Sequence, residues 1–210
     1  MHNPEYYKNI AELFAYPDES LVVKARVFRD NIHFHSPVNQ EKLGVFLDAV
    51  EKLGVKRQKE YYSKTFDVQA VCYLDIGYMM FGEDYKRAQM LVNLQKEHEI
   101  AGIDCGTELS DHLPNVLRLL AETNNIELAE ELGFIILIPA IRFMLTKFKN
   151  IDNYYKNLLE VLLEMLQHDF KGDELLEFAF SEESFSGKNE FLMPSPKMTI
   201  CDSNCKQKRF

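Results

Sequence analysis

The sequence predicts an all-α protein, and two observations support this fold class. Apolar residues recur at the three- and four-residue spacing of amphipathic helices, and no segment of useful length alternates between apolar and polar residues. Proline, glycine and capping residues divide the chain into helix-length segments. We expect a single-domain bundle of about eight or nine helices over residues 1–170. A loosely docked or disordered tail is expected over residues 171–210, where the periodicity decays.

The first three helices are predicted from their start and stop signals. Asn3-Pro4 combines a good N-cap with proline at the first helical position, which predicts a helix over 4–15. Pro17 ends this helix, because the residue before a proline is pushed out of the α region. A second helix is expected with Asp18 or Ser20 as its cap. A third helix should begin at Ser36-Pro37 and stop near Gly54.

The later helices are predicted from glycine stops and apolar spacing. They are expected over 56–66, over 67–81 with a stop at Gly82, over 84–101 with a stop at Gly102, from Leu113 to about Glu122, over 125–148 and over 152–168. Pro139 lies inside the helix expected over 125–148, where it removes an i→i−4 hydrogen bond. We therefore expect this apolar helix, which also contains Gly133, to be kinked.

Composition and charge narrow the possible functions. The 24 Lys and Arg residues against 33 Asp and Glu residues give a net charge of −9, which argues against nucleic-acid binding by phosphate neutralisation. The longest apolar run has nine residues, whereas a membrane span needs about 20. Neither a signal peptide nor the cysteine spacing of a secreted scaffold is present. We expect a reduced, cytoplasmic protein without a transmembrane segment.

Residues 108–114, Glu-Leu-Ser-Asp-His-Leu-Pro, form the most informative segment, and we call it the hinge segment. One interpretation is an acid–base or metal-dependent site built from Glu108, Asp111 and His112. The other is a rigid polar connection between two helices, with Ser110 or Asp111 as the N-cap and His112 in the first turn. Adjacent helical side chains point about 100° apart, which disfavours a pair between Asp111 and His112. A carboxylate at the N-terminus of a helix also accepts hydrogen bonds from the unpaired N–H groups of the first turn, so we favour the second interpretation.

Metal-like spacing occurs only in His33-Phe34-His35 and in Cys201-x-x-x-Cys205. A structural zinc site needs four ligands, usually as two close pairs, and nothing in the spacing joins these two pairs across the chain. We therefore expect no metal site. Phosphate-binding glycine loops are also absent from the sequence.

A stripe of aromatic and methionine side chains lies near the middle of the chain. Its members are Tyr73, Tyr78, Met79, Met80 and Phe81. Such a stripe is usually part of a core, but adaptable aromatic and methionine surfaces also suit grooves that receive amphipathic helices. An acidic protein with such a groove would prefer a peptide that carries both leucines and arginines.

Several short motifs occur in an order that resembles one protein family. They are Tyr16-Pro17-Asp18, Tyr62-x-x-x-Phe66-Asp67, Gly82-Glu83 with Arg87-Ala88-Gln89-Met90, Gly102, and Glu108-Leu109-x-Asp111-His112-Leu113-Pro114. This succession, over roughly residues 10–165, resembles the molybdenum-cofactor assembly chaperones of respiratory nitrate reductase. These are also called delta subunits, or NarJ-type redox-enzyme maturation chaperones.

The resemblance implies an all-helical cytoplasmic chaperone and no enzymatic activity. Such a chaperone would bind the N-terminal segment of a molybdopterin oxidoreductase catalytic subunit, from nitrate reductase or a relative. It would hold this segment for cofactor insertion before membrane docking or export, without stably binding the cofactor itself. We expect a monomer or a weak dimer. A permanent structural subunit of the client complex is the remaining alternative.

The motif of the family implies which residues would serve as the hinge and peptide-binding region. With the aromatic stripe, the expected set is Glu108, Leu109, Asp111, His112, Leu113, Pro114, Tyr78 and Phe81. Ser110 stands where the family commonly has proline, which should loosen the loop and leaves the identity of the client open.

Overall fold

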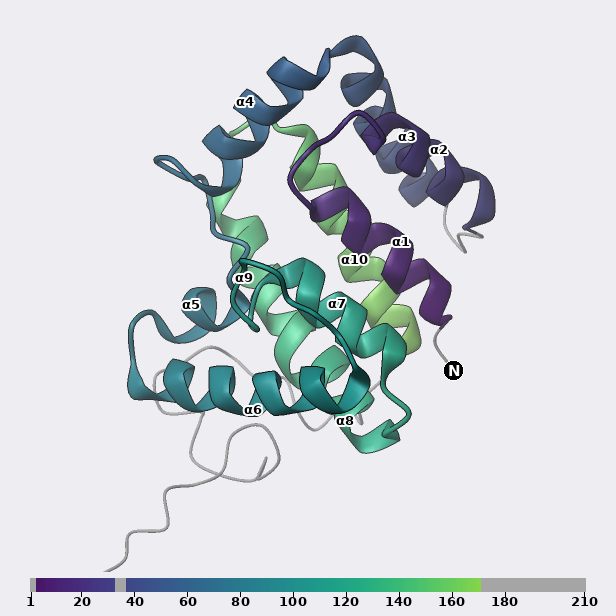
Figure 1. The fold of residues 1–210 in the computed structure, drawn as a ribbon. Helices are drawn as coiled ribbons and strands as arrows, with labels where there is room; N and C mark the ends of the chain where they lie inside the picture. Colours follow the sequence, from purple (N-terminus) through teal and green to yellow (C-terminus); the bar gives the residue numbers. More distant parts are fainter. Residues whose placement is uncertain (1–2, 33–36, 171–210) are drawn as a thin grey trace, which may run out of the picture.

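A computed structural model describes residues 3–32 and 37–170 of the chain (Figure 1). Within these residues the all-α prediction is confirmed, and the only β-type pairing is an isolated bridge between Asp75 and His112. The helices are α1 (Pro4–Phe14), α2 (Leu21–Asn31), α3 (Pro37–Lys52), α4 (Val55–Phe66), α5 (Ile76–Phe81), α6 (Tyr85–Ala101), α7 (Leu113–Glu122), α8 (Ile126–Glu130), a π-helical turn (Glu131–Leu137), α9 (Ile138–Lys147) and α10 (Tyr154–Asp169). When α8, the π-helical turn and α9 are counted as one helix, this part of the chain contains nine helices.

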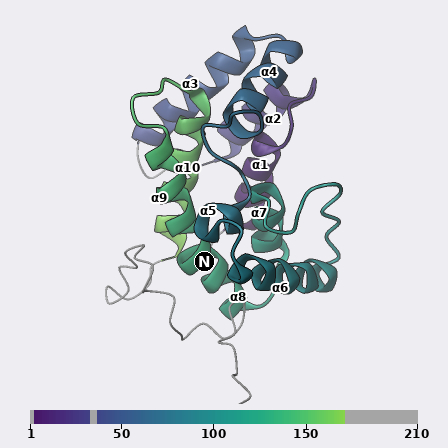
Figure 2. The ribbon, with the colours of Figure 1, turned by 90° about the vertical axis from the view of Figure 1, so that its left-hand side faces the viewer.

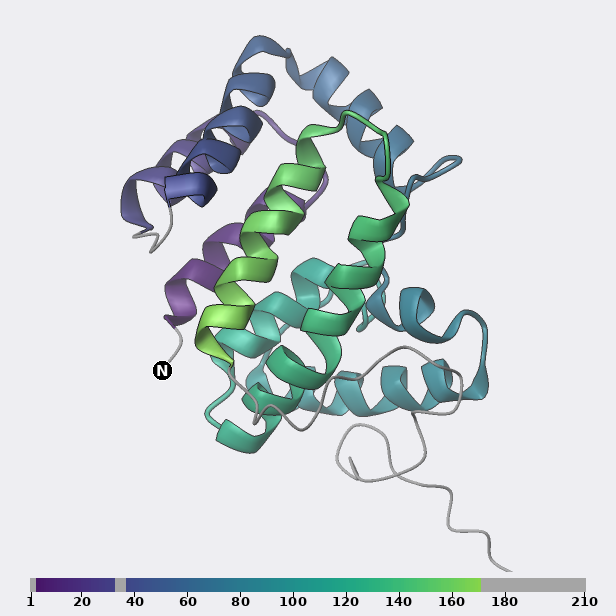
Figure 3. The ribbon, with the colours of Figure 1, turned by 180° about the vertical axis from the view of Figure 1, so that it is seen from behind.

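The helices form a bundle whose two ends are built from different parts of the chain. In Figures 1 and 2, α2, α3 and α4 lie at one end, and α5, α6 and α8 lie at the other. The two ends are joined by α1, α7, α9 and α10. Helix α1 packs on α7, and α10 packs on both α3 and α9, which lies beside it in Figure 3.

The core lies between these joining helices. It contains fully buried side chains such as Phe14 of α1, Leu117 of α7 and Leu158 of α10. Each large apolar side chain removed from water contributes about 1.5–3 kcal/mol before entropy is counted. This core fixes the positions of α5, α6 and the hinge segment, which lie at its edge.

Capping residues lie at the beginnings and ends of the helices where the sequence indicates. Asn3 accepts a hydrogen bond from the backbone N–H of Glu5, and Pro4 lies in the first turn of α1, as predicted. Asp84 accepts in the same way from the N–H of Lys86 at the start of α6. Gly102 ends α6 with a φ of 69°, a left-handed conformation that glycine adopts without steric cost.

The helix predicted over 67–81 is wrong in its first half. Helix α4 ends at Phe66, and residues 67–75 form a loop in which the N–H groups of Val71 and Cys72 both donate to the carbonyl of Thr65. Only Ile76–Phe81 is helical. Cys72, expected on a helix, therefore lies in this loop, where burial raises the pKa of its thiol to about 12.

The helical stretch predicted over 125–148 is continuous, and its irregularity is a π-helical turn. The N–H of Ile138 donates to the carbonyl of Gly133, one residue further back than in an α-helix. Pro139 follows directly and has no N–H to donate. The wider turn therefore lies just before the residue that cannot continue the α-helical hydrogen-bond ladder.

The end of α10 packs against this π-helical turn and against α1. A Cβ atom added to Gly133 would lie 2.4 Å from Cγ of Phe170, so the phenyl ring occupies the space that a larger residue would need. The Tyr7 and Phe170 ring centroids are 6.2 Å apart. The Tyr7 hydroxyl donates to Oδ2 of Asp169 at 2.9 Å. These contacts join the first and last described helices.

None of the helices in residues 3–32 and 37–170 combines the length and the apolar character needed to cross a membrane. The tail expected over 171–210, including Cys201 and Cys205, lies outside the described residues, and so does the His33-Phe34-His35 segment.

Candidate functional site

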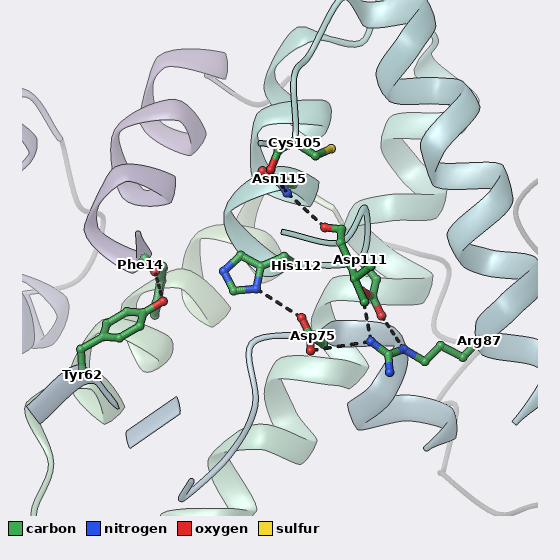
Figure 4. A network of polar contacts seen from close by, with 9 residues as sticks. Phe14, Tyr62, Asp75, Arg87, Cys105, Asp111, His112 and Asn115 are labelled. Atoms are coloured by element: carbon green, nitrogen blue, oxygen red, sulfur yellow. Dashed lines mark hydrogen bonds and ion pairs between the residues drawn. The ribbon is translucent and has the colours of Figure 1, made fainter. Parts of the chain in front are cut away.

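The hinge segment lies between α6 and α7 and pairs with the loop that leads into α5. The N–H of Leu113 donates to the carbonyl of Leu74, and the N–H of Ile76 donates to the carbonyl of Asp111, each at 2.9 Å. These two bonds make the isolated antiparallel bridge of the structure. The entry to α5 and the entry to α7 are thereby held side by side (Figure 4).

Asp111 is fully buried and paired with Arg87 of α6. The guanidinium Nε donates to Oδ2 at 2.9 Å, and Nη2 donates to Oδ1 at 3.4 Å. Burial raises the pKa of Asp111 above its usual range, and the hydrogen bond and positive charge of Arg87 offset only part of this rise. A carboxylate held in this way fixes geometry well and is poorly placed to exchange protons with a substrate.

The expected capping role of Asp111 is wrong. The N-cap of α7 is His112, and no side chain caps this helix end. The Asp111 carboxylate points to α6 because Arg87 offers it a forked pair of donors, which outweighs one bond to a helix N–H. Pro114 does lie in the first turn of α7, as predicted.

Gly77 makes the position of Asp111 possible. A Cβ at Gly77 would come within 2.7 Å of Oδ2 of Asp111 and within 3.2 Å of Cγ of Arg87. The ion pair therefore lies directly against the α5 backbone. The sequence offers one signal for this close approach: Gly77 is the one small residue in a helix whose other side chains are large and mostly apolar.

Asp75 links the buried ion pair to His112. Its Oδ1 lies 3.3 Å from Nδ1 of His112, and its Oδ2 lies 3.6 Å from Nη2 of Arg87. The Asp75 side chain is 31% exposed and that of His112 is 14% exposed. The polar contacts therefore run from His112 at the edge of the site through Asp75 and Arg87 to the buried Asp111 (Figure 4).

Glu108, Asp111 and His112 do not form one catalytic unit among the described residues. Asp111 pairs with Arg87, His112 pairs with Asp75, and Glu108 is exposed. The predicted divergence of Asp111 and His112 agrees with these separate partners. No group of three or more His, Cys, Asp or Glu side chains in the described residues could hold a metal ion.

The rest of the hinge segment is fixed to α6 and α7. The Ser110 hydroxyl donates to the carbonyl of Leu91 at 2.9 Å, so the residue expected to loosen the loop also ties it to α6. The Asn115 amide donates to the carbonyl of Leu109 at 3.1 Å. Leu113 and Pro114 are buried, and Leu109 is 50% exposed.

The aromatic stripe lies beside this network, divided between the 67–75 loop and α5. The Tyr73 and Tyr78 rings meet edge to face, with centroids 5.1 Å apart. The guanidinium of Arg87 lies 5.2 Å from the centre of the Tyr78 ring. Met79, Met80 and Phe81 are half-buried against the core. We call the five stripe residues together the α5 surface.

Three carboxylates lie near the buried Tyr62, and two of them, Asp75 and Glu108, belong to the segments described above. Asp67, Glu108 and Asp75 all act electrostatically on the buried Tyr62, whose pKa is raised first by burial and then by these charges. The Tyr62 hydroxyl itself donates to the carbonyl of Phe14 at 3.1 Å, beside the network in Figure 4. The candidate site thus combines aromatic rings with a negative edge.

The hinge segment, Tyr78 and Phe81 were predicted for the site, but three of its organising residues were not. Asp75 and Gly77 were hidden inside the helix predicted over 67–81, and Arg87 was noted only as part of a motif. An aspartate directly before Ile76-Gly77 was the available signal of a new helix start.

Comparison with known proteins adds an independent observation. No family model matches the chain. Two curated relatives do match it, both described as the nitrate reductase molybdenum cofactor assembly chaperone NarJ, from Escherichia coli strain K12 and from Escherichia coli O157:H7. Each is 26% identical to the chain over 172 residues, which is 80% of this chain and 72% of the relative. The chain is therefore a distant homologue of the NarJ-type molybdenum cofactor assembly chaperones.

Proposed function

We propose that this protein is a cytoplasmic maturation chaperone, not an enzyme, for a molybdopterin oxidoreductase. It binds the N-terminal segment of the catalytic subunit, from nitrate reductase or a relative, and holds it while the molybdenum cofactor is inserted. Membrane docking or export of the client follows release. The chaperone stably binds no cofactor of its own.

The observation that carries this proposal is the position of the α5 surface beside a hinge segment held by the buried Asp111–Arg87 ion pair. Tyr73 is 40% exposed and Leu109 is 50% exposed, so apolar side chains of both the α5 surface and the hinge segment are accessible to a peptide. Asp67, Asp75 and Glu108 supply negative charge for a basic peptide. Homology to proteins described as nitrate reductase molybdenum cofactor assembly chaperones supports the same assignment.

The energetics suit a chaperone that must release its client. Four apolar anchors would contribute about 6–12 kcal/mol in gross terms, at about 1.5–3 kcal/mol each. Association and ordering of the peptide cost at least about 4 kcal/mol. The net gain is then at most about 8 kcal/mol, which sets micromolar affinity as the tight limit. Attraction by the carboxylates adds to this and weakens as salt screens it.

Calorimetry with a synthetic peptide tests the proposal. The probe is the N-terminal segment of the nitrate reductase catalytic subunit encoded in the same genome, titrated at low and high salt. We expect micromolar binding that Tyr78→Ala weakens about tenfold or more, because the ring presents an anchor to the peptide. Val45→Ala is the matched control, since Val45 is 47% exposed on α3 at the opposite end of the bundle (Figure 1).

Two results would contradict the proposal. One is that, at low salt, calorimetry detects no heat of peptide binding and the protein does not co-purify with the full-length client. The other is stoichiometric retention of the protein in the mature, cofactor-loaded enzyme, which would make it a structural subunit. Turnover that depended on Glu108 and His112 would instead support the enzyme alternative, although the pairing of Asp111 with Arg87 argues against it.

A further inference from the structure

The segment formed by residues 191–210 has the chemistry that the α5 surface and its carboxylates would select. It contains four basic residues, Lys197, Lys206, Lys208 and Arg209, against one acidic residue, Asp202. Its apolar residues are Phe191, Leu192, Met193, Met198, Ile200 and Phe210. Residues 171–190 have the opposite balance, with six acidic and two basic residues. The positive charge is therefore concentrated in one part of the tail.

We propose that residues 191–210 bind in cis to the α5 surface and the adjoining hinge segment, and thereby compete with the client peptide. The inference rests on the proposed peptide-binding function. The basic side chains would lie near Asp67, Asp75 and Glu108, and the apolar side chains would pack on Tyr73 and Tyr78. The client would then have to displace a segment of the chaperone that resembles it.

The α5 surface and its carboxylates are at least partly exposed in the part of the chain that the structure describes, so such a segment could reach them. Tyr73 is 40% exposed, Asp75 has 31% of its side chain exposed, and Asp67 and Glu108 are both exposed. Arg87, which lies 3.6 Å from Asp75, is already paired with the buried Asp111. A basic ligand would therefore meet net negative charge at this edge.

The length of the connecting chain permits the contact. The described residues end at Phe170, whose ring packs against Gly133 and Tyr7. Twenty intervening residues reach at most about 66–72 Å when extended. A helical domain of about 170 residues has a radius of gyration of about 15 Å, so every part of its surface lies within this reach.

Tethering makes even a weak contact effective. A short flexible linker gives an effective concentration of about 1 mM. A segment that bound in trans with a Kd of about 0.1 mM would then occupy the surface about nine-tenths of the time. Client binding would be weakened about tenfold, and the client would gain access mainly by competition.

Paramagnetic relaxation in the full chain tests the contact directly. A spin label on Cys205, in a variant with Cys105→Ser and Cys201→Ser, leaves only the buried Cys72 as a further thiol. We expect the amide signals of Tyr73, Asp75 and Tyr78 to lose intensity several-fold, and those of Val23 and Val45 at the other end of the bundle to stay unchanged. About 0.5 M salt should restore the lost intensity. Uniform broadening, or broadening centred elsewhere, would overturn the proposal.

A charge variant tests the competition. Lys206→Gln, Lys208→Gln and Arg209→Gln together should abolish the relaxation effect and raise the affinity for the synthetic client peptide about tenfold. Lys171→Gln with Lys188→Gln, which removes both basic residues of the 171–190 segment, is the control, and it should change neither. If the relaxation effect is present but client affinity is unchanged in the charge variant, the segment docks without competing and the inference fails. If no client peptide binds to any variant, the proposed function and the competition both fail, and the relaxation result alone decides whether the segment docks.

Discussion

Arg87 is the residue on which the contacts of the candidate site converge. Its guanidinium binds the buried Asp111, reaches Asp75 and lies over the ring of Tyr78. Replacing a forked, planar cation of this kind leaves several groups without a partner at once. The effect of its removal should therefore exceed that of an ordinary surface charge.

Arg87→Met should destabilise the fold strongly, and more at neutral than at acidic pH. Asp111 would become a buried carboxylate without a partner, at a cost of about 3–5 kcal/mol. The pKa of Asp111 in the folded state is already raised by burial and would rise further. The contribution of Asp111 to stability is therefore fully present below its pKa in the unfolded state. It is lost as the pH rises through its pKa in the folded state. Urea melts at pH 5 and at pH 7.5 measure the difference.

Arg26→Met is the control for this prediction. Arg26 pairs with Glu51 at 2.7 Å, but its side chain is 55% exposed. An exposed pair contributes about 0–1 kcal/mol, so this variant should unfold almost like the parent protein at both pH values. Equal losses for Arg87→Met at the two pH values would show that Asp111 is not the affected group.

Gly77→Ala should be destabilising although alanine is the better helix former. The new methyl group would lie 2.7 Å from Oδ2 of Asp111, whose carboxylate is held by Arg87 and cannot easily move. Overpacking of this kind costs about 1–3 kcal/mol. Gly44→Ala in α3 is the matched control, because nothing lies within 4 Å of its added Cβ. Thermal melts should show a loss for the first variant and no loss for the second.

The contacts of the site were harder to predict than its position. The hinge segment stood out because acidic residues, a histidine and a proline occur within seven positions. The partners of Asp111 and His112 lie 24 and 37 residues away in the sequence. Local spacing rules describe neighbours on one helix, so they assigned Asp111 to a cap and did not identify Arg87 or Asp75.

At the scale of elements, most helices could be predicted and the loop over 67–75 could not. Proline and glycine signals located α1, α3 and α6 to within a few residues. The 67–75 loop carries apolar residues at helix-compatible positions, but it forms turns and bends, and the carbonyl of Leu74 pairs with the N–H of Leu113. That pairing is a tertiary contact, and tertiary contacts override weak helix propensity.

The π-helical turn and α10 should prove energetically coupled. Gly133→Ala places a methyl group 2.4 Å from Cγ of Phe170, which predicts a loss of about 1–3 kcal/mol. In a Phe170→Ala background the space is free, so the same change should cost little or should stabilise, as Gly-to-Ala changes in helices do by about 0.5–1 kcal/mol. A double-mutant cycle measured by urea unfolding tests this. Additive effects would mean that the ring does not occupy the space above Gly133.

For the whole molecule, fold stability and the proposed chaperone activity should respond differently to changes in the hinge segment. His112→Ala removes a side chain at the edge of the network, so client maturation should fall while the melting temperature changes by only a few degrees. Asp111→Ala leaves Arg87 without its closest partner, so both quantities should fall. Circular dichroism melts and the activity of the co-expressed client separate the two cases. A collapsed melt for His112→Ala would assign this residue a purely structural role.

The bridge between the α5 entry and the hinge segment has a consequence for the kinetics of the molecule. The amide hydrogens of Ile76 and Leu113 each bond across the bridge, so each is released only when the two loops separate. Under conditions in which reclosing is slower than intrinsic exchange, both should exchange with deuterium at the rate of the same opening event, although they lie far apart in the sequence. Their shared rate would report how often the two loops part, and a bound peptide that spans both loops would slow the two amides together.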